Sequence, residues 1–259
     1  MDLRLGRWQD ALADVTCDAI ICDPPYGART HAAATTRSDG VDAAGLTPDY
    51  PPWTRDDVHE FVGSWSPRCR GWMVCMTDHS LISAYEDAYT AAGRYVFPPL
   101  PLIIRGMSHR MQADGPSSEC VWAVAGWSGA IMVARPRSKT FVDLKWNSRG
   151  FFKGDWDPPD HFDGPSIRNG RRGGTSSGKG RGKPAWLEHA LVRSYSRPGW
   201  IVCDPLAGFG GMLAAAVSLG RTAIGAEMDP EAYQEATRRL ARPLQIDMFA
   251  ARAAEEGMG

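Results

Sequence analysis

The alternation of strand-like and helix-like segments near the C-terminus is the feature that most constrains the fold. Apolar and amphipathic patterns predict strand, glycine-rich turn, helix, strand and helix over residues 200–204, 205–211, 212–219, 222–228 and 230–240. Gly220 suits the end of the first helix, and Asp229 suits the cap of the second. Strands separated by single helices pair in parallel through right-handed crossovers. The sequence therefore predicts an α/β fold.

The preceding part of the chain shows three more apolar strand patterns, at residues 17–22, 71–76 and 120–125. One helix is predicted over 81–92, and another over 184–196, where Pro184 suits a first helical position. Residues 27–55 are rich in Gly, Ala, Thr, Asp and Pro without a sustained period, so we expect a long loop of the kind that often forms a lid. Residues 135–182 also lack periodicity, which predicts an insertion.

Length and composition fit one domain with an insertion. The chain has 259 residues, of which 43% are hydrophobic and 23% charged, as in ordinary globular proteins. No apolar run approaches the ~18 residues of a membrane span, and the N-terminus lacks a secretory pattern, so we expect a cytoplasmic protein. The six cysteines form no Cys-x-x-Cys pair, which favours reduced core thiols. Cys69, Cys75 and His79 lack a second ligand pair at zinc spacing, so no metal is expected.

The turn at residues 204–211 has the layout of a nucleoside-binding site. A strand ends in Asp204, a glycine-rich turn leads into a helix, and Glu227 closes the next strand. Glycines let a ligand approach the backbone at the helix N-terminus, and an acid about 20 residues later can accept hydrogen bonds from both ribose hydroxyls. A tight turn with a helix cap is the alternative. A dinucleotide fingerprint would need a third glycine at the position of Leu213.

The segment Asp23-Pro24-Pro25-Tyr26 directly follows an apolar strand. The prolines fix the turn, so the Asp23 carboxylate and the Pro24 carbonyl can both accept from one amino group, and Tyr26 offers a ring for stacking on a base. A second copy of the first three residues, at 157–159, has neither a preceding strand nor a following aromatic residue. We interpret that copy as a loop.

With Lys183-Pro184 before the second turn and Ile224-Gly225-Ala226-Glu227 after it, this order of motifs resembles the β-class DNA amino-methyltransferases. In that class the catalytic half precedes the cofactor-binding half. The resemblance implies a Rossmann-like S-adenosylmethionine-dependent methyltransferase fold, with a mixed seven-stranded sheet and an inserted recognition region. It divides the chain into a catalytic half, a target-recognition insertion, a cofactor-binding half and a tail, at 1–134, 135–182, 183–244 and 245–259.

The resemblance also implies roles for the site residues. The catalytic group, which would hold the exocyclic amino group of a flipped base, is Asp23, Pro24, Pro25 and Tyr26. The contacts to S-adenosylmethionine would come from Lys183, Asp204, Pro205, Leu206, Ala207, Gly208, Phe209, Gly210 and Glu227. The family turn usually reads Asp-Pro-Phe-x-Gly-Ser-Gly-Thr, from which this chain departs at Leu206, Phe209 and Gly211. The family also favours Gly-Asp near the N-terminus, where this chain has Gly6-Arg7.

A basic cluster marks the predicted contact with double-stranded DNA. The net charge of −1 shows no overall basic excess. However, residues 168–183 contain no acid and are rich in Gly and Ser. We expect phosphate contacts there from Arg168, Arg171, Arg172, Lys179 and Arg181. A solvated linker is the alternative.

Asp23 favours adenine N6 as the methylated atom. Cytosine-N4 enzymes more often have Ser-Pro-Pro-Tyr, and enzymes that methylate protein glutamine typically have Asn-Pro-Pro-Tyr. RNA substrates and a homodimer stay open. A non-catalytic DNA-binding or cofactor-sensing subunit would explain the altered turn, although the intact motif at 23–26 argues against it. A dinucleotide-dependent oxidoreductase is disfavoured by Leu213.

The tail contains a second motif with a predicted partner. The segment 245–249, which reads Gln-Ile-Asp-Met-Phe, resembles the short peptides that dock bacterial replication and repair proteins on the sliding clamp. Ile246, Met248 and Phe249 can anchor in an apolar groove, with Gln245 hydrogen-bonded at its rim. Packing of these residues on the domain itself is the alternative.

Overall fold

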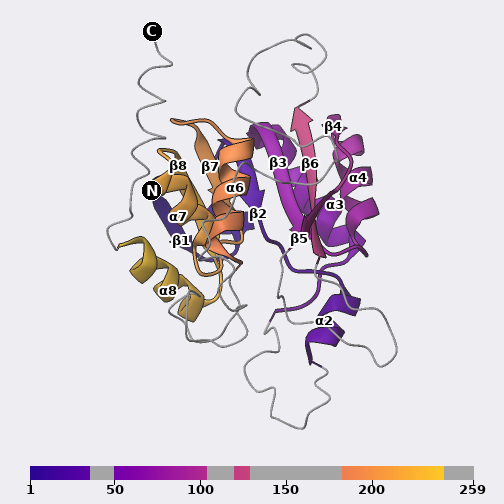
Figure 1. Ribbon diagram of the computed structural model, residues 1–259, viewed down its shortest axis with the longest axis horizontal. Coiled ribbons are helices and arrows are strands. Elements are labelled where there is room, and N and C mark those ends of the chain that lie inside the picture. Colours follow the sequence, from indigo (N-terminus) through magenta and orange to yellow (C-terminus); the bar gives the residue numbers. More distant parts are fainter. Residues whose placement is uncertain (36–49, 104–119, 129–182, 242–259) are drawn as a thin grey trace.

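The computed structural model describes residues 1–35, 50–103, 120–128 and 183–241 (Figure 1). The predicted insertion at 135–182, with its basic cluster, and the clamp-like tail segment at 245–249 lie outside the described residues. In chain order the elements are β1 (Asp2–Leu5), α1 (Trp8–Ala11), β2 (Cys17–Cys22), α2 (Ala28–Thr35), α3 (Arg55–Trp65), η1 (Ser66–Arg68), β3 (Cys69–Thr77), α4 (Ile82–Ala91), β4 (Arg94–Val96), β5 (Leu100–Ile103), β6 (Cys120–Ser128), α6 (Ala185–Tyr195), β7 (Ile201–Asp204), α7 (Gly211–Ser218), β8 (Thr222–Glu227) and α8 (Pro230–Leu240).

The described strands form one mixed sheet in the order β1-β8-β7-β2-β3-β6-β4, with β5 also paired to β6. Pairing is parallel from β1 to β3, and β6 runs antiparallel to β3, β4 and β5. The described part of the sheet has eight strands, so the prediction of seven was wrong. Pro98 and Pro99 are the reason, because proline interrupts strand pairing and divides one edge strand into β4 and β5. Both pieces lie along β6.

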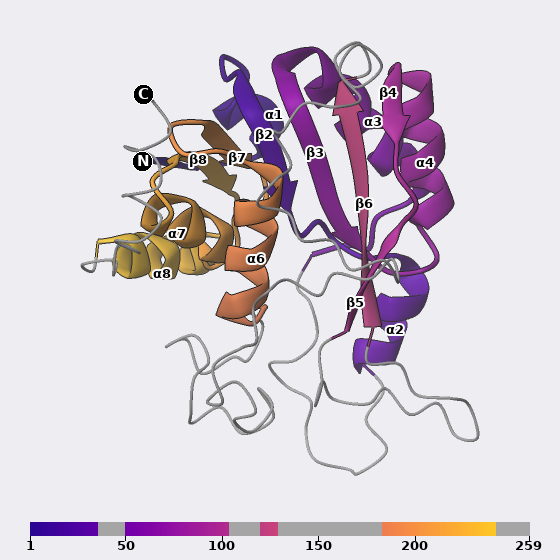
Figure 2. The ribbon, with the colours of Figure 1, turned by 45° about the horizontal axis from the view of Figure 1, so that its top comes forward.

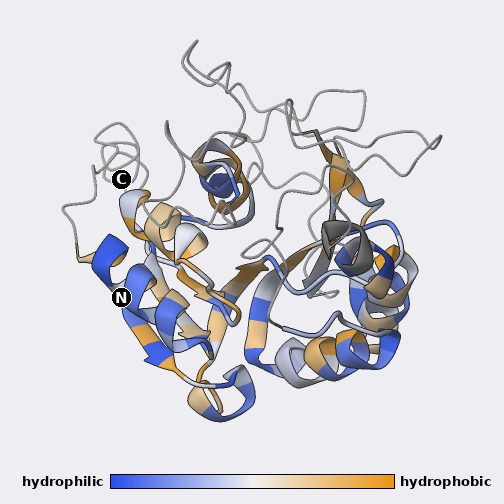
Figure 3. Ribbon diagram, turned by 90° about the horizontal axis from the view of Figure 1, so that it is seen from below, coloured by the Kyte–Doolittle hydropathy of each residue, from blue (hydrophilic) through white to orange (hydrophobic). Residues whose placement is uncertain are grey.

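Two layers of helices cover the sheet. Residues of α6, α7 and α8 pack in one hydrophobic cluster on one face, and those of α1, α3 and α4 pack in a second cluster on the other face (Figure 2). Successive residues of β2 alternate between the clusters, with Ile21 in the first and Ile20 in the second. In Figure 3 the strands between the helical layers carry hydrophobic stretches next to hydrophilic ones. The chain thus forms a three-layer α/β structure.

The cysteines belong to this core. All six are free thiols, and five of them are buried. Within the described ranges, no group of three or more His, Cys, Asp or Glu side chains could hold a metal ion. No helix in the described part of the chain is long and apolar enough to cross a membrane.

The C-terminal part of the described chain follows the sequence pattern closely, since α7 and α8 lie within one residue of their predicted bounds. Asp229 caps α8 as expected, accepting a hydrogen bond from the Ala232 backbone N–H at 2.7 Å. The predicted loop at 27–55 was wrong in part, because it contains α2. Four of the eight residues of α2 are alanine, the strongest helix former, and that propensity accounts for the helix.

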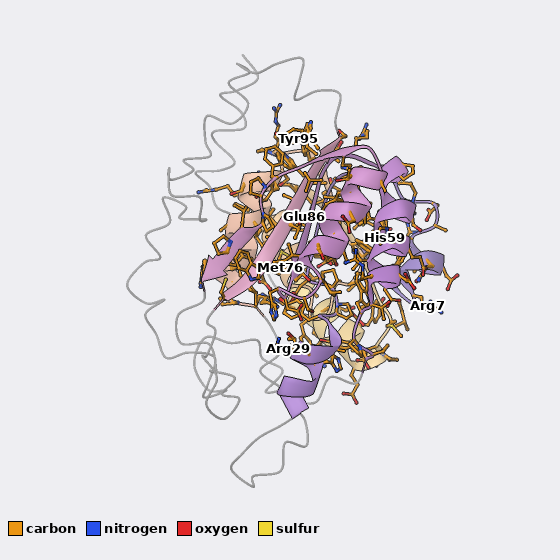
Figure 4. The ribbon with its side chains drawn as sticks, turned by 90° about the vertical axis from the view of Figure 1, so that its right-hand side faces the viewer. Arg7, Arg29, His59, Met76, Glu86 and Tyr95 are labelled. Carbon is orange, nitrogen blue, oxygen red and sulfur yellow. The ribbon has the colours of Figure 1, made fainter. Side chains whose placement is uncertain are left out.

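The position of α2 matters for the site. Figure 4 shows Arg29 of α2 at one end of the molecule and Tyr95 of β4 at the other, with Met76 of β3 between them. Met76 is the last residue but one of β3, so this strand runs toward α2. Helix α2 therefore lies beyond the carboxyl end of β3.

Candidate active site

The carboxyl ends of β2 and β7 lie side by side in the sheet. The two strands are parallel, with Ile20 opposite Cys203. From β7 the chain passes through α7 to β8 on one side, and from β2 it passes through α3 to β3 on the other side. Open α/β sheets bind ligands outside the strand ends where connections diverge in this way. We call this place, where Asp23 follows β2 and Asp204 ends β7, the switch point.

Lys183 contacts two residues of the predicted catalytic motif. Its Nζ donates a hydrogen bond to Asp23 Oδ2 and forms an ion pair with that carboxylate, 160 positions away in the sequence. The same ammonium lies 5.0 Å from the centre of the Tyr26 ring. Asp23 Oδ1 is buried and has no hydrogen-bond partner among the described residues. The structure therefore brings three predicted site residues together and leaves one carboxylate oxygen available as an acceptor.

Asp78 anchors the turn that carries Tyr26. The backbone N–H of Gly27 donates to Asp78 Oδ2 at 3.0 Å, and Asp78 Oδ1 accepts from the Ser80 backbone N–H at 2.9 Å. The pKa of Asp78 lies below its usual value. Burial alone would raise this pKa, but the hydrogen bonds from Ser80, Thr30 and Gly27 together have the larger effect and lower it. A β-carbon on Gly27 would overlap Ser80 Oγ, so any other residue at this position would displace the Ser80 side chain.

The role of Asp78 was not predicted from the sequence. The available indication was its place directly after a buried strand, like Asp23 and Asp204, because carboxyl ends of neighbouring parallel strands share one edge of the sheet.

The turn between β7 and α7 holds the second motif. Gly208 and Gly210 have positive φ angles of 51° and 74°, which favour glycine. Gly208 donates its backbone N–H to Glu227 Oε2 at 2.7 Å, and Glu227 Oε1 accepts from the Asp229 backbone N–H at 2.8 Å. Burial raises the pKa of Glu227. The two hydrogen bonds fix the predicted ribose acceptor beside the turn.

Asp204 stabilises the same turn through a hydrogen bond to its backbone. Its carboxylate accepts from the Leu206 backbone N–H at 3.2 Å. The side chain is buried, and burial raises the pKa of Asp204 well above its usual value. Asp204 therefore shapes the turn through its backbone contact.

A residue that sequence analysis missed, Glu188 of α6, lies against the start of α7. It is 5% exposed and forms an ion pair with Arg239 at 3.5 Å. A β-carbon on Gly211 would overlap Glu188 Oε1, so the carboxylate takes the space of a side chain at position 211. Burial raises the pKa of Glu188 to about 7, although Arg239 and Lys183 pull it down. The indication in the sequence was an acidic residue directly beside Leu187 on the apolar face of the helix.

Comparison with known proteins identifies the family. A family model for DNA methylases of the N6/N4 type matches residues 108–238, which is half of the chain. The chain belongs to this DNA methylase family. Members are DNA amino-methyltransferases that use S-adenosylmethionine, so the resemblance stated from the sequence is confirmed.

Solved methylase structures share the fold. M1.HpyAVI in complex with S-adenosylmethionine is 18% identical, with a TM-score of 0.63 over 93% of this chain and 98% of that one. TTHA0409 from Thermus thermophilus, also a complex with S-adenosylmethionine, is 17% identical, with a TM-score of 0.55 over 93% and 95%. The cytosine-N4-specific PvuII methyltransferase is 11% identical, with a TM-score of 0.54 over 98% and 90%. The predicted methyltransferase fold is thereby confirmed.

The residues at the switch point fit the family's cofactor. A β-carbon on Gly208 would meet no described atom within 4 Å, so the turn is open to a ligand beside Glu227. S-adenosylmethionine carries a sulfonium and an ammonium group, and the site gathers four acidic side chains, since Asp204 interacts electrostatically with Asp23, Glu188 and Glu227. Acidic side chains with raised pKa values become easier to ionise when positive groups arrive, so they suit a ligand with two such groups.

Proposed function

We propose that this methylase transfers a methyl group from S-adenosylmethionine to the exocyclic amino nitrogen of a base flipped out of duplex DNA, and that the atom is N6 of adenine. The observation that carries the proposal is the buried Asp23 Oδ1, which is an acceptor without a hydrogen-bond partner in the described ranges. It lies at the switch point, in the same turn as the Tyr26 ring. A buried acceptor costs free energy unless a donor reaches it, and an amino group is such a donor.

The roles of the side chains follow from this geometry. The cofactor supplies an electrophilic methyl group. Asp23 Oδ1 accepts one N–H of the amino group and the Pro24 carbonyl accepts the other, while Tyr26 stacks on the base. These contacts orient the nitrogen lone pair toward the methyl group, and such positioning supplies much of the rate. After the methyl group has arrived, the nitrogen is positively charged and gives one proton to the Asp23 carboxylate or to water, while the former sulfonium becomes a neutral thioether.

Adenine is proposed because of the residue at position 23. The cytosine-N4-specific PvuII enzyme has the same fold, so the fold does not choose between the two bases. Cytosine-N4 enzymes more often carry serine at the position of Asp23. Cytosine N4 is therefore the alternative target.

Binding of duplex DNA is proposed to involve Arg168, Arg171, Arg172, Lys179 and Arg181, whose charges suit phosphate. A bacterial sliding clamp is proposed as a partner of the segment 245–249. Both proposals rest on sequence patterns outside the described residues.

The test is to incubate the chain with S-adenosylmethionine labelled in its methyl group and mixed-sequence duplex DNA from a methylation-free host. The DNA is digested to nucleosides, which are separated and identified by mass. We expect labelled N6-methyldeoxyadenosine. Labelled N4-methyldeoxycytidine would overturn the choice of adenine, and absence of label from DNA, with or without label in a parallel RNA sample, would overturn the proposed function.

A further inference from the structure

Lys183 contacts both side chains that a target base would use, those of Asp23 and Tyr26. Its ammonium donates to Asp23 and lies 5.0 Å from the centre of the Tyr26 ring, in the position of a cation over an aromatic face. The proposed target presents an amino nitrogen to Asp23 and a ring to Tyr26. The lysine and the base therefore compete for the same two side chains.

We propose that Lys183 is shared between two carboxylates, that of Asp23 and that of the amino-acid part of S-adenosylmethionine. The cofactor draws Lys183 away from Asp23 Oδ2 and from the Tyr26 ring, and thereby clears the space through which a base reaches Asp23 Oδ1 and stacks on Tyr26. This inference rests on the proposed function, because it takes S-adenosylmethionine to bind at the switch point. It makes Lys183 a positioning residue that couples the binding of cofactor and base.

The charges around Lys183 support the exchange. The carboxylates of Asp23 and Glu188 both interact with its ammonium, and Arg239 of α8 forms an ion pair with Glu188. The carboxylate of the cofactor would enter a site rich in acidic side chains, where an unpaired negative charge is costly. Lys183 is a described cation near this turn that also reaches Asp23. Its charge can therefore neutralise the incoming carboxylate.

The side chain also has the freedom that an exchange needs. The Lys183 side chain is 18% exposed, and that of Asp23 is 29% exposed, so neither is sealed in the core. Lysine is a point charge on a flexible four-carbon stem, and rotamer changes in such side chains take picoseconds to nanoseconds. When the lysine leaves Oδ2, the amino group of the base donates to Oδ1 of the same carboxylate. Asp23 is thus not left without a partner.

The test measures cofactor binding alone, so it needs no recognition sequence. Calorimetry gives the affinity of S-adenosylhomocysteine, which carries the amino-acid part, and of 5′-methylthioadenosine, which lacks it. The proteins are the wild type, Lys183→Met, Asp23→Asn and the double variant, each checked for normal thermal unfolding. Glu227→Ala is the control that should weaken both ligands, because it acts on the ribose.

We expect Lys183→Met to weaken S-adenosylhomocysteine about ten-fold or more and to change 5′-methylthioadenosine by less than about two-fold, since a charged hydrogen bond is lost from only one ligand. Asp23→Asn should tighten S-adenosylhomocysteine about three-fold or more, because Lys183 no longer has to leave a charged partner. In the Lys183→Met background the same substitution should have no effect.

Unchanged or weaker binding of S-adenosylhomocysteine by Asp23→Asn overturns the inference, and so does an equal loss of both ligands in Lys183→Met. Both results leave the proposed function standing. A wild-type chain that binds neither nucleoside would overturn the proposed function and this inference with it.

Discussion

Glu188 of α6 leaves no room for a side chain at Gly211, the first residue of α7. A carboxylate oxygen of Glu188 fills the space where a β-carbon on Gly211 would be. The two residues join α6, which follows Lys183, to α7, which follows the cofactor turn. The family usually has threonine where this chain has Gly211. Glu188 therefore explains the departure, since its carboxylate needs the space that a threonine side chain would take.

We expect Gly211→Ala to destabilise the protein by about 1–3 kcal/mol, because the new methyl group overlaps a buried carboxylate. In a Glu188→Ala background the sign should reverse, since alanine is favoured over glycine within a helix by about 0.5–1 kcal/mol. Urea denaturation of the wild type, the two single variants and the double variant measures both effects. An equal cost in both backgrounds would show that Glu188 does not limit position 211.

Stability should depend on pH through Glu188. Burial raises its pKa to about 7 from the usual 4.5, so the folded state holds the proton more tightly than the unfolded state. Its contribution is fully present below the unfolded pKa and is lost as pH rises through about 7. The loss is on the order of 1–3 kcal/mol.

The matched control is Glu188→Gln, which keeps the shape and cannot titrate. Denaturation at a series of pH values should show the variant gaining stability over the wild type between about pH 5 and pH 8. A difference that stays constant over this range would mean that Glu188 is already ionised in the folded state.

Glu227→Ala should weaken S-adenosylmethionine, because the ribose hydroxyls lose a charged acceptor worth about 1.5–3 kcal/mol per hydrogen bond. Asp229→Ala is the matched control two residues later. It removes the cap of α8, at a cost of about 1 kcal/mol in stability, while leaving cofactor affinity nearly unchanged. If calorimetry finds equal affinity in Glu227→Ala and the wild type, the ribose is held elsewhere.

Neutralising Arg171, Arg172, Lys179 and Arg181 should flatten the dependence of log affinity for duplex DNA on log salt concentration. The expected change is roughly 0.9 per lost phosphate contact. Fluorescence anisotropy at several salt concentrations gives the slope. The same slope in the variant and the wild type would assign these residues to a solvated linker.

The sequence predicts the parts of the site that depend on local patterns. An apolar run followed by Asp23 or Asp204 predicts a strand with a carboxylate at its end, and positive φ angles at Gly208 and Gly210 agree with a glycine-rich ligand turn. Asp229 caps α8 for the same local reason. Such features need no knowledge of distant residues.

What the sequence does not predict are contacts set by the packing of distant elements. Glu188 meets Gly211 only after α6 has packed on α7, and Asp78 meets Gly27 only after β3 has paired with β2. The contact of Lys183 with Asp23 joins residues 160 positions apart. Pro98 and Pro99 indicate a break between β4 and β5. The two strands themselves are not predicted, because three and four residues are too few to show an apolar period.

The most direct test of the central claim compares methyl transfer with cofactor binding in Asp23→Ala. The measurement is the rate of label transfer from S-adenosylmethionine to DNA at saturating cofactor, with cofactor affinity determined by calorimetry on the same sample. If Asp23 holds the target amino group, transfer is abolished while cofactor affinity stays within a few-fold of the wild type. Near-normal transfer by the variant would contradict the assignment of Asp23 and with it the proposed active site.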